Sequence, residues 1–350
     1  MKKIVLIAIL PVVISMASCN KQDQKKFFQL WNNCESLEKL ISYVKDVTNK
    51  NSKNFIPVED RIATFDMDGT FIGELYPTYF EYNLLEYRAL EDPTYTDKDP
   101  FVVETAQDIR KFVREGVKLP NYDETHGFDL KHAYAAAKAY AGMTVDEFDR
   151  YVKEYAKKDA NGFSGLTYAN SFYKPMLEIF DYLKANDFTY YVVSGSDRYI
   201  CRALVDSLGI QSNRVIGMDV VLKSSAQEGD GVNWTMSSSE HLIRTDELII
   251  KNLKTNKVKQ ISQEIGKIPV LSFGNSSGDC AMHNYCKSNP KYKTEVFMVV
   301  ADDFDRDHTT QSIADRAITW AKDGYNMFSE KNDFKTIYGD GVIKTDFIFN

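Results

Sequence analysis

The chain has 350 residues, of which 43% are hydrophobic and 27% are charged, and its formal net charge is −7. This length allows one large domain or two modest ones with a sizeable buried core. The negative charge disfavours the backbone of a nucleic acid as the main partner. It also means that any site for an anionic substrate must supply its own local positive charge.

The first residues predict export. Lys2 and Lys3 precede an apolar run over residues 4–14, which is followed by small residues and Cys19. A basic start, a short apolar stretch and small residues are typical of a secretory signal, and the run is too short to span a bilayer comfortably.

Residues 16–19 (Met-Ala-Ser-Cys) resemble the cleavage motif of bacterial lipoproteins, with Met16 in place of the more usual Leu. We therefore expect a signal peptide over residues 1–18, lipidation of Cys19 and a tether over residues 19–30. On this interpretation the protein is an exported lipoprotein on the periplasmic or cell-envelope face, and the lipid anchor is its contact with a membrane. The alternative is ordinary cleavage and release.

Hydrophobic spacing then predicts the elements in chain order. A helix is expected over residues 36–47, and a short buried strand over residues 61–65 ends at Asp66. Within residues 71–173 helices dominate, at 100–115, 130–140 and 145–157. From residue 174 the chain alternates between helices (175–185, 198–208, 254–265 and 279–285) and strands (188–193, 214–222, 269–273 and 295–300), with 232–236 as one further strand.

Alternating strands and helices predict an α/β fold, a doubly wound parallel sheet covered on both faces. The Rossmann-like core takes residues 31–70 and 174–350, and residues 71–173 form an inserted helical cap. Four cysteines follow the signal at spacings that do not indicate a zinc site, and free thiols are the favoured state for Cys34, Cys201, Cys280 and Cys286.

Polar residues follow three of the predicted strands, where ligands bind in such sheets. The first group, residues 66–70, is Asp-Met-Asp-Gly-Thr. Asp66 can attack phosphorus and carry a phosphoryl group, and Asp68 can protonate the leaving oxygen. The same residues also suit a plain turn. A carboxylate that attacks a phosphate dianion needs a divalent cation to offset the repulsion.

The second group is Ser194 and Gly195, whose hydroxyl and backbone N–H groups at a helix start can hold phosphate oxygens, or cap the helix alone. In the third group, Asn275 and Asp279 offer oxygen ligands suited to Mg²⁺. Lys257 is the candidate cation that screens the phosphate, although a solvated basic face is the common state of lysines in such a run.

In this order the four groups resemble the signature of the haloacid dehalogenase superfamily, in its phosphoserine-phosphatase-like branch. Residues 61–66, 174–178 and 273–279 are also similar to a subgroup of exported bacterial members. The resemblance covers residues 31–338 and implies a Rossmann-like hydrolase core. This chain departs from the family at Asn275, where many phosphatases of this branch have Asp. The second acid, Asp68, argues for phosphoryl transfer rather than dehalogenation.

The resemblance implies a role for each matched residue. Asp66 is the nucleophile, Asp68 the acid and base, and Lys257 the bridge between phosphate and nucleophile. Phosphate-binding residues are Thr70, Ser194, Gly195 and Lys257; metal ligands are Asp66, Asp68 through its carbonyl, Asn275 and Asp279.

The expected substrate is a small phosphorylated metabolite, hydrolysed with Mg²⁺ as cofactor. Phosphoserine is the family's namesake substrate, and export favours phosphocholine or phosphoethanolamine as an alternative. Glu74 would then face a cationic leaving group, or else lie in a surface loop. A surface binding protein without turnover is the other alternative.

Overall fold

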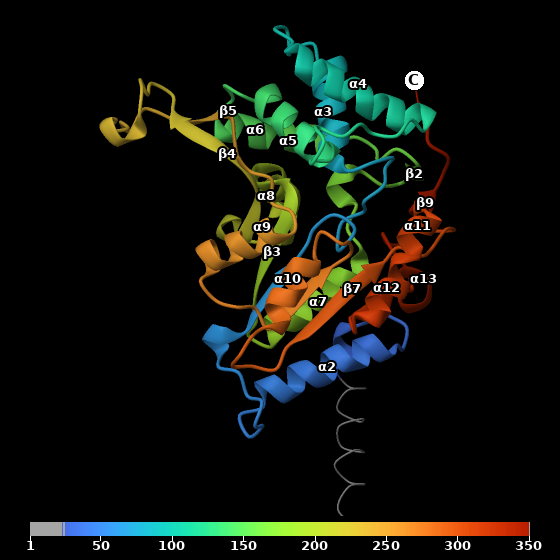
Figure 1. The fold of residues 1–350 in the computed structure, drawn as a ribbon. Coiled ribbons are helices and arrows are strands. Elements are labelled where there is room, and N and C mark those ends of the chain that lie inside the picture. Colours follow the sequence, from blue (N-terminus) through green and yellow to red (C-terminus); the bar gives the residue numbers. More distant parts are fainter. Residues whose placement is uncertain (1–22, 24, 350) are drawn as a thin grey trace, which may run out of the picture.

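The computed structural model describes residues 23 and 25–349 (Figure 1). Within this part a seven-stranded sheet has the order β5-β4-β3-β1-β6-β7-β8. Strand β5 is antiparallel to β4 and the other neighbours are parallel, which confirms the predicted fold class. The strands are β1 (Ile62–Phe65), β3 (Thr189–Asp197), β4 (Val215–Ser224), β5 (Leu242–Ile250), β6 (Leu271–Gly274), β7 (Glu295–Val300) and β8 (Asn326–Ser329).

Strand β1 lies at the centre because its residues are buried on both faces, as expected for a parallel strand between two helical layers. Phe65 stacks on Phe273 of β6 with ring centroids 4.2 Å apart, and Phe297 and Phe328 continue the row across β7 and β8. This row of rings lines one face of the sheet across four strands.

Helices cover both faces. Phe297 belongs to the same hydrophobic cluster as α2 (Glu35–Thr48) and α7 (Lys174–Ala185), whereas its neighbours Val296 and Met298 pack with Cys286 and Trp320 on the other face. That other face carries α10 (Cys280–Lys287) and α12 (Arg316–Lys322). The remaining α-helices of the core are α8 (Arg198–Val205), α9 (Thr255–Gln260), α11 (Gln311–Ala314) and α13 (Glu330–Asp333).

The segment between β1 and α7 forms a helical cap grouped at one end of the molecule (Figure 1). Its two connections run side by side, since Ile72 pairs with Phe172 and the Gly73 N–H donates to the Ser171 carbonyl at 2.8 Å. The cap helices are α3 (Phe80–Leu90), α4 (Pro100–Glu115), α5 (Phe128–Ala139) and α6 (Val145–Ala156), and β2 (Phe163–Ser164) pairs with the C-terminal β9 (Ile343–Lys344).

The prediction of a strand over residues 232–236 is wrong. A 3-10 turn, Gly231–Asn233, occupies this place and Val232 is 88% exposed, because the β4–β5 ladder ends at the pair Ser224 and Leu242. The alternating side chains of residues 232–236 therefore have no sheet to pack on.

The N-terminal residues and the cysteines can be compared with their predictions. The signal peptide and Cys19 lie outside the described residues. The tether was predicted to reach residue 30, but Phe28 is 2% exposed and packs on Tyr182 of α7, so the packed core begins earlier. The four predicted free cysteines are free. Over the described residues, every helix is too short or too polar to cross a membrane.

A buried ion pair joins the end of β3 to β5. Arg244 Nη2 lies 2.6 Å from Asp197 Oδ2, and both side chains are at most 2% exposed. We expect Arg244→Ala to lower the free energy of unfolding by about 3–5 kcal/mol, because it leaves a buried carboxylate without its partner. Urea unfolding of the mature protein measures this.

Lys153→Ala is the control. The Lys153 side chain is 39% exposed, and it forms ion pairs with Asp149 and Asp206. It should cost less than about 1 kcal/mol. Equal losses in the two variants would contradict a structural role for the buried pair.

Candidate active site

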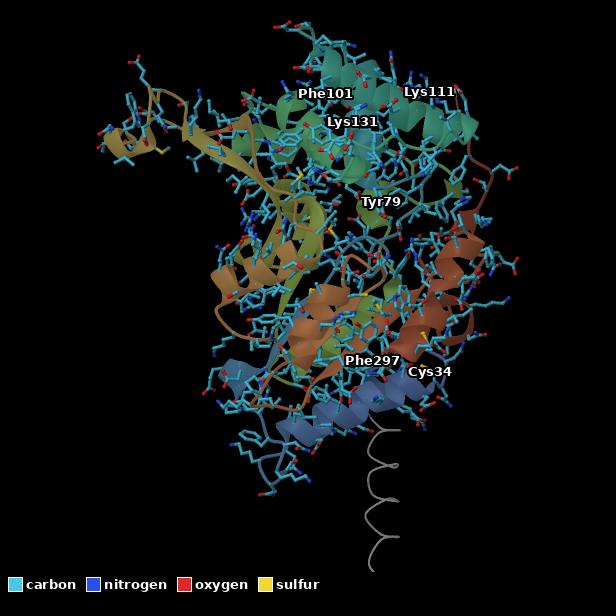
Figure 2. All side chains as sticks on the ribbon, in the orientation of Figure 1. Cys34, Tyr79, Phe101, Lys111, Lys131 and Phe297 are labelled. Carbon is cyan, nitrogen blue, oxygen red and sulfur yellow. The ribbon has the colours of Figure 1, made fainter. Side chains whose placement is uncertain are left out.

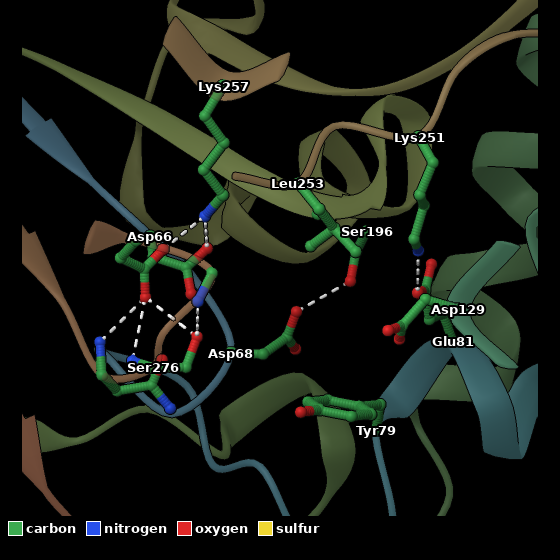
Figure 3. Close-up of a pocket in the computed structure, with 14 residues that line it drawn as sticks. Asp66, Asp68, Tyr79, Glu81, Asp129, Ser196, Lys251, Leu253, Lys257 and Ser276 are labelled. Carbon is green, nitrogen blue, oxygen red and sulfur yellow. Dashed lines mark hydrogen bonds and ion pairs between the residues drawn. The ribbon is translucent and has the colours of Figure 1, made fainter. Parts of the chain in front are cut away.

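A pocket lies at the carboxyl ends of the parallel strands, between the sheet and the cap (Figure 3). Its volume is about 70 Å³. Tyr79 lies where the cap meets the core (Figure 2). The lining residues are Asp66, Asp68, Tyr79, Glu81, Asp129, Gly195, Ser196, Lys251, Leu253, Lys257, Asn275, Ser276, Gly278 and Asp279.

Lys257 occupies the centre of the buried end. The residue is 1% exposed, and its Nζ donates to Asp66 Oδ1 and to Asp279 Oδ1, each at 2.6 Å. Asp66 follows β1, Asp279 precedes α10, and Lys257 lies in the first turns of α9. The structure thus brings together three residues that the sequence predicted for one site, and Lys257 is not part of a solvated face.

Asp279 is held from both sides. While Oδ1 accepts from Lys257, Oδ2 accepts from the backbone N–H groups of Asn275 and Ser276 at 3.1 and 3.0 Å. Burial acts to raise the pKa of Asp279, but the charge and hydrogen bond of Lys257, with His283 and the Asn275 N–H, together lower it below its usual value. Because both oxygens are engaged, Asp279 orients Lys257 and the 275–279 loop.

The two acids of the first motif have raised pKa values. Burial, together with repulsion from Asp279, raises the pKa of Asp66 to about 7 against the opposing effect of Lys257. Burial and then the charge of Asp66 raise the pKa of Asp68 to about 8. The pocket therefore holds more negative charge than Lys257 can offset, which is the electrostatic condition that a divalent cation relieves.

The second motif is arranged differently from the prediction. Strand β3 continues to Asp197, and Asp197, not Ser194, caps α8. The predicted start of this helix at residue 198 is confirmed, but Ser194 does not cap it, because the chain stays extended until Asp197 accepts from the Tyr199 N–H. Ser194 is fully buried, and its hydroxyl accepts from the Ser196 N–H at 3.0 Å.

Ser196 is the hydroxyl that reaches the pocket. It donates to Asp68 Oδ2 at 2.7 Å, which fixes the orientation of this carboxyl. Gly195 also lines the pocket, and a Cβ there would lie 2.5 Å from Leu253 Cδ2, so only glycine lets Leu253 approach so closely. Thr70 is buried below the pocket, outside its lining.

Glu74 and Asn275 form a buried pair. Asn275 Nδ2 donates to Glu74 Oε2 at 2.8 Å, and the Tyr79 hydroxyl donates to Glu74 Oε1 at 2.8 Å. Glu74 is 6% exposed and lies outside the pocket lining, so it faces neither a leaving group nor solvent. Since Glu74 accepts two hydrogen bonds, the Asn275 amide must point its NH₂ toward it and its oxygen away.

This arrangement suits a Mg²⁺ ion. Asn275 Oδ1 is buried without a hydrogen-bond partner among the described residues, and Asp66 supplies a carboxylate to the same pocket. The described residues contain no ready group of three or more His, Cys, Asp or Glu ligands. Mg²⁺ nevertheless binds through one or two carboxylates and keeps several waters, so the residues present fit this ion.

Eight lining residues were not assigned to the site from the sequence: Tyr79, Glu81, Asp129, Lys251, Leu253, Ser196, Ser276 and Gly278. The first three come from the cap and Lys251 follows β5, so no short motif connects them. Ser196 could have been found, because it directly follows Ser194 and Gly195 in the same motif.

Three solved structures are similar in fold. A protein of unknown function from Anaerococcus prevotii DSM 20548 matches with a TM-score of 0.51 at 15% identity, over 87% of this chain and 94% of that chain. A cytosolic 5′-nucleotidase IIIB bound to cytidine matches with a TM-score of 0.50 at 11% identity, over 89% and 92%. A phosphoserine phosphohydrolase-like protein from Francisella tularensis subsp. tularensis SCHU S4 gives 0.41 at 14%, over 77% and 94%.

The first two likenesses show that the chain shares the fold of those two proteins. No protein-family model matches the chain, and no curated protein matches it.

The turn after Asp68 depends on Gly69. This residue has φ +71°, and a Cβ there would lie 1.9 Å from Asn275 Nδ2 and 2.5 Å from Glu74 Oε2. We expect Gly69→Ala to lower the free energy of unfolding by roughly 1–2 kcal/mol through its backbone conformation and by roughly 1–3 kcal/mol more through this overlap.

Gly116→Ala is the matched control. Gly116 has φ +69°, but nothing lies within 4 Å of a Cβ there, so only the backbone cost should remain. Chemical denaturation of both variants separates the two effects, and equal losses would show that Gly69 does not hold Asn275 and Glu74 in place.

Proposed function

We propose that the chain is a Mg²⁺-dependent phosphomonoester hydrolase that acts on a small organic phosphate through a phosphorylated Asp66. The observation that carries this proposal is the buried contact of Lys257 with both Asp66 and Asp279. A second acid, Asp68, lies beside it, oriented by Ser196. A nucleophile, a fixed cation and an oriented acid are the parts that phosphoryl transfer through a carboxylate requires.

The residues divide the reaction into two steps. In the first, an Asp66 oxygen forms a bond to phosphorus as the ester P–O bond breaks, and Asp68 gives its proton to the departing alcohol oxygen. In the second, Asp68 takes a proton from water as the water oxygen attacks phosphorus, and inorganic phosphate leaves Asp66 unchanged. Lys257 holds Asp66 in position throughout and offsets the charge of the phosphoryl oxygens.

Asp66, Asn275 and the Asp68 carbonyl would hold the Mg²⁺, with Asp279 supporting the loop that carries Asn275. A bound Mg²⁺ would offset the repulsion between Asp66 and a phosphate dianion. The small cavity favours a small alcohol as the leaving group. Phosphoserine is one such substrate, and phosphocholine or phosphoethanolamine is the alternative that export favours.

Two further proposals follow from the sequence. Cleavage after residue 18 and lipidation of Cys19 would place the protein at the bacterial cell envelope as an exported lipoprotein. A surface binding protein without turnover is the second candidate function, favoured by Asn275 in place of the usual Asp. The oriented pair of Asp66 and Asp68 argues against it, because binding alone needs no acid and base.

We expect the mature protein to release phosphate from para-nitrophenyl phosphate and a panel of phosphomonoesters with Mg²⁺, and to lose this activity with chelator. Asp66→Asn should lower the rate roughly 10³-fold or more, because it removes the nucleophile. Asp302→Asn is the control, since Asp302 follows β7 at the same sheet edge, outside the pocket lining. No release from any ester with any divalent metal would overturn the enzyme and favour the binding protein.

We expect Glu74 to determine whether an Asp at position 275 strengthens or weakens Mg²⁺ binding. We expect Asn275→Asp to weaken Mg²⁺ binding although it adds a negative ligand, because the new carboxylate would face Glu74 at the 2.8 Å contact that the amide now makes. Glu74→Gln in the same protein should restore or exceed the original affinity. Isothermal titration calorimetry with Mg²⁺ on the three proteins measures this, and tighter binding by Asn275→Asp alone would contradict it.

A further inference from the structure

The pocket has two ends, and Asp68 lies between them (Figure 3). One end holds Asp66, Lys257 and Asn275, where the proposed function places the phosphoryl group. Because Asp68 must reach the oxygen that joins phosphorus to the alcohol, the alcohol has to extend toward the other end. That end has no role in the chemical steps described above.

The second end is built by Tyr79 and Glu81 at the start of α3, Asp129 in the first turn of α5, and Lys251 after β5. Lys251 Nζ lies 2.9 Å from Glu81 Oε1, and both side chains are at most 8% exposed. This lysine therefore pairs with Glu81, and the charge of Asp129 also attracts it. His132 adds no charge beneath Glu81, because burial lowers its pKa.

Asp129 is the second acid of this end, and among the described residues it forms no ion pair, although Lys251 lies close enough for the two charges to attract. Its Oδ1 accepts from the Tyr82 hydroxyl at 2.9 Å, which orients the carboxylate without offsetting its charge. Unlike Glu81, Asp129 is exposed to solvent and lies at the mouth of the pocket. The two acids and one base leave this end with one formal negative charge.

An aromatic ring completes the wall. The Tyr79 hydroxyl is bound to Glu74, and its ring packs edge to face on Tyr82 with centroids 5.3 Å apart. The ring is thus fixed at the pocket, and the face of such a ring attracts cations. A carboxylate and an aromatic face together select an ammonium group over a neutral or anionic one.

We propose that Asp129, with Tyr79 beside it, forms a subsite for the positively charged group of an amino-alcohol phosphate. This proposal rests on the proposed function and deepens it. It names the class of leaving group and assigns its recognition to Asp129 in cap helix α5 rather than to Glu74. The volume of about 70 Å³ suits a substituent of two or three carbons better than a nucleoside.

The test compares esters that differ only in charge. Phosphoethanolamine is matched with n-propyl phosphate, and phosphocholine with 3,3-dimethylbutyl phosphate. We expect kcat/KM to be at least tenfold higher for the cationic member of one pair. Asp129→Asn should lower this ratio at least fivefold, mainly through KM, and Asp129→Lys should reverse it.

Asp146→Asn is the matched control, because Asp146 is exposed and occupies the first turn of cap helix α6, as Asp129 does in α5. It should leave the ratio unchanged. A ratio within twofold of one in the wild type, with both esters hydrolysed, would overturn the subsite and leave the phosphatase standing. An equal fall in Asp146→Asn would show a general effect of cap charge and would also overturn it.

Failure of the proposed function is a separate outcome, seen as no hydrolysis of any ester. The subsite is then decided by binding, measured by calorimetry with the same ester pairs on wild type and Asp129→Asn. Tighter binding of the cationic ester, lost in Asp129→Asn, supports the subsite without turnover, and equal binding of both esters overturns it.

Discussion

The site depends on one buried lysine held between two carboxylates. Lys257 reaches Asp66 at the end of β1 and Asp279 after β6, each at 2.6 Å. Removing charges from water is costly, and such a group persists only when every member has a partner. Two acids share one base here, so the group retains a negative charge that the interior cannot solvate. Burial and then this excess of negative charge raise the pKa values of Asp66 and Asp68. A divalent cation would offset the excess.

The same constraint explains Asn275. A third carboxylate at that position would add to an excess that Lys257 does not offset, and it would face Glu74. The structure instead places the extra charge on Glu74, one hydrogen bond behind the pocket, and leaves the neutral Asn275 Oδ1 without a partner. At the proposed metal site, Asn275 in place of the usual Asp would set a carboxylate one hydrogen bond behind the metal ligands rather than remove it from the site.

The sequence predicted the elements whose burial dictates their pattern. Strands β1, β6 and β7 are buried along nearly their whole length and appear as apolar runs. Strand β5 was missed because it is an edge strand with most of its residues partly or fully exposed. The motifs located Asp66, Lys257 and Asp279, and the start of α8 was predicted at residue 198. The predicted end of β3 at residue 193 was too early, because the strand continues to Asp197, and Ser196 rather than Ser194 lines the pocket.

The cap residues were beyond reach of the sequence for a different reason. Glu81 and Lys251 are 170 positions apart and meet only because β5 folds back against the cap. Their ion pair spans the boundary between cap and core on the wall of the pocket. The Lys257 end of the pocket is buried while Asp129 is exposed, so under the proposed function a phosphomonoester would enter phosphate first and its alcohol would leave past Asp129. Under that proposal, a carboxylate at the exit would meet both the substrate and the product alcohol, and from this position one charge could select between substrates.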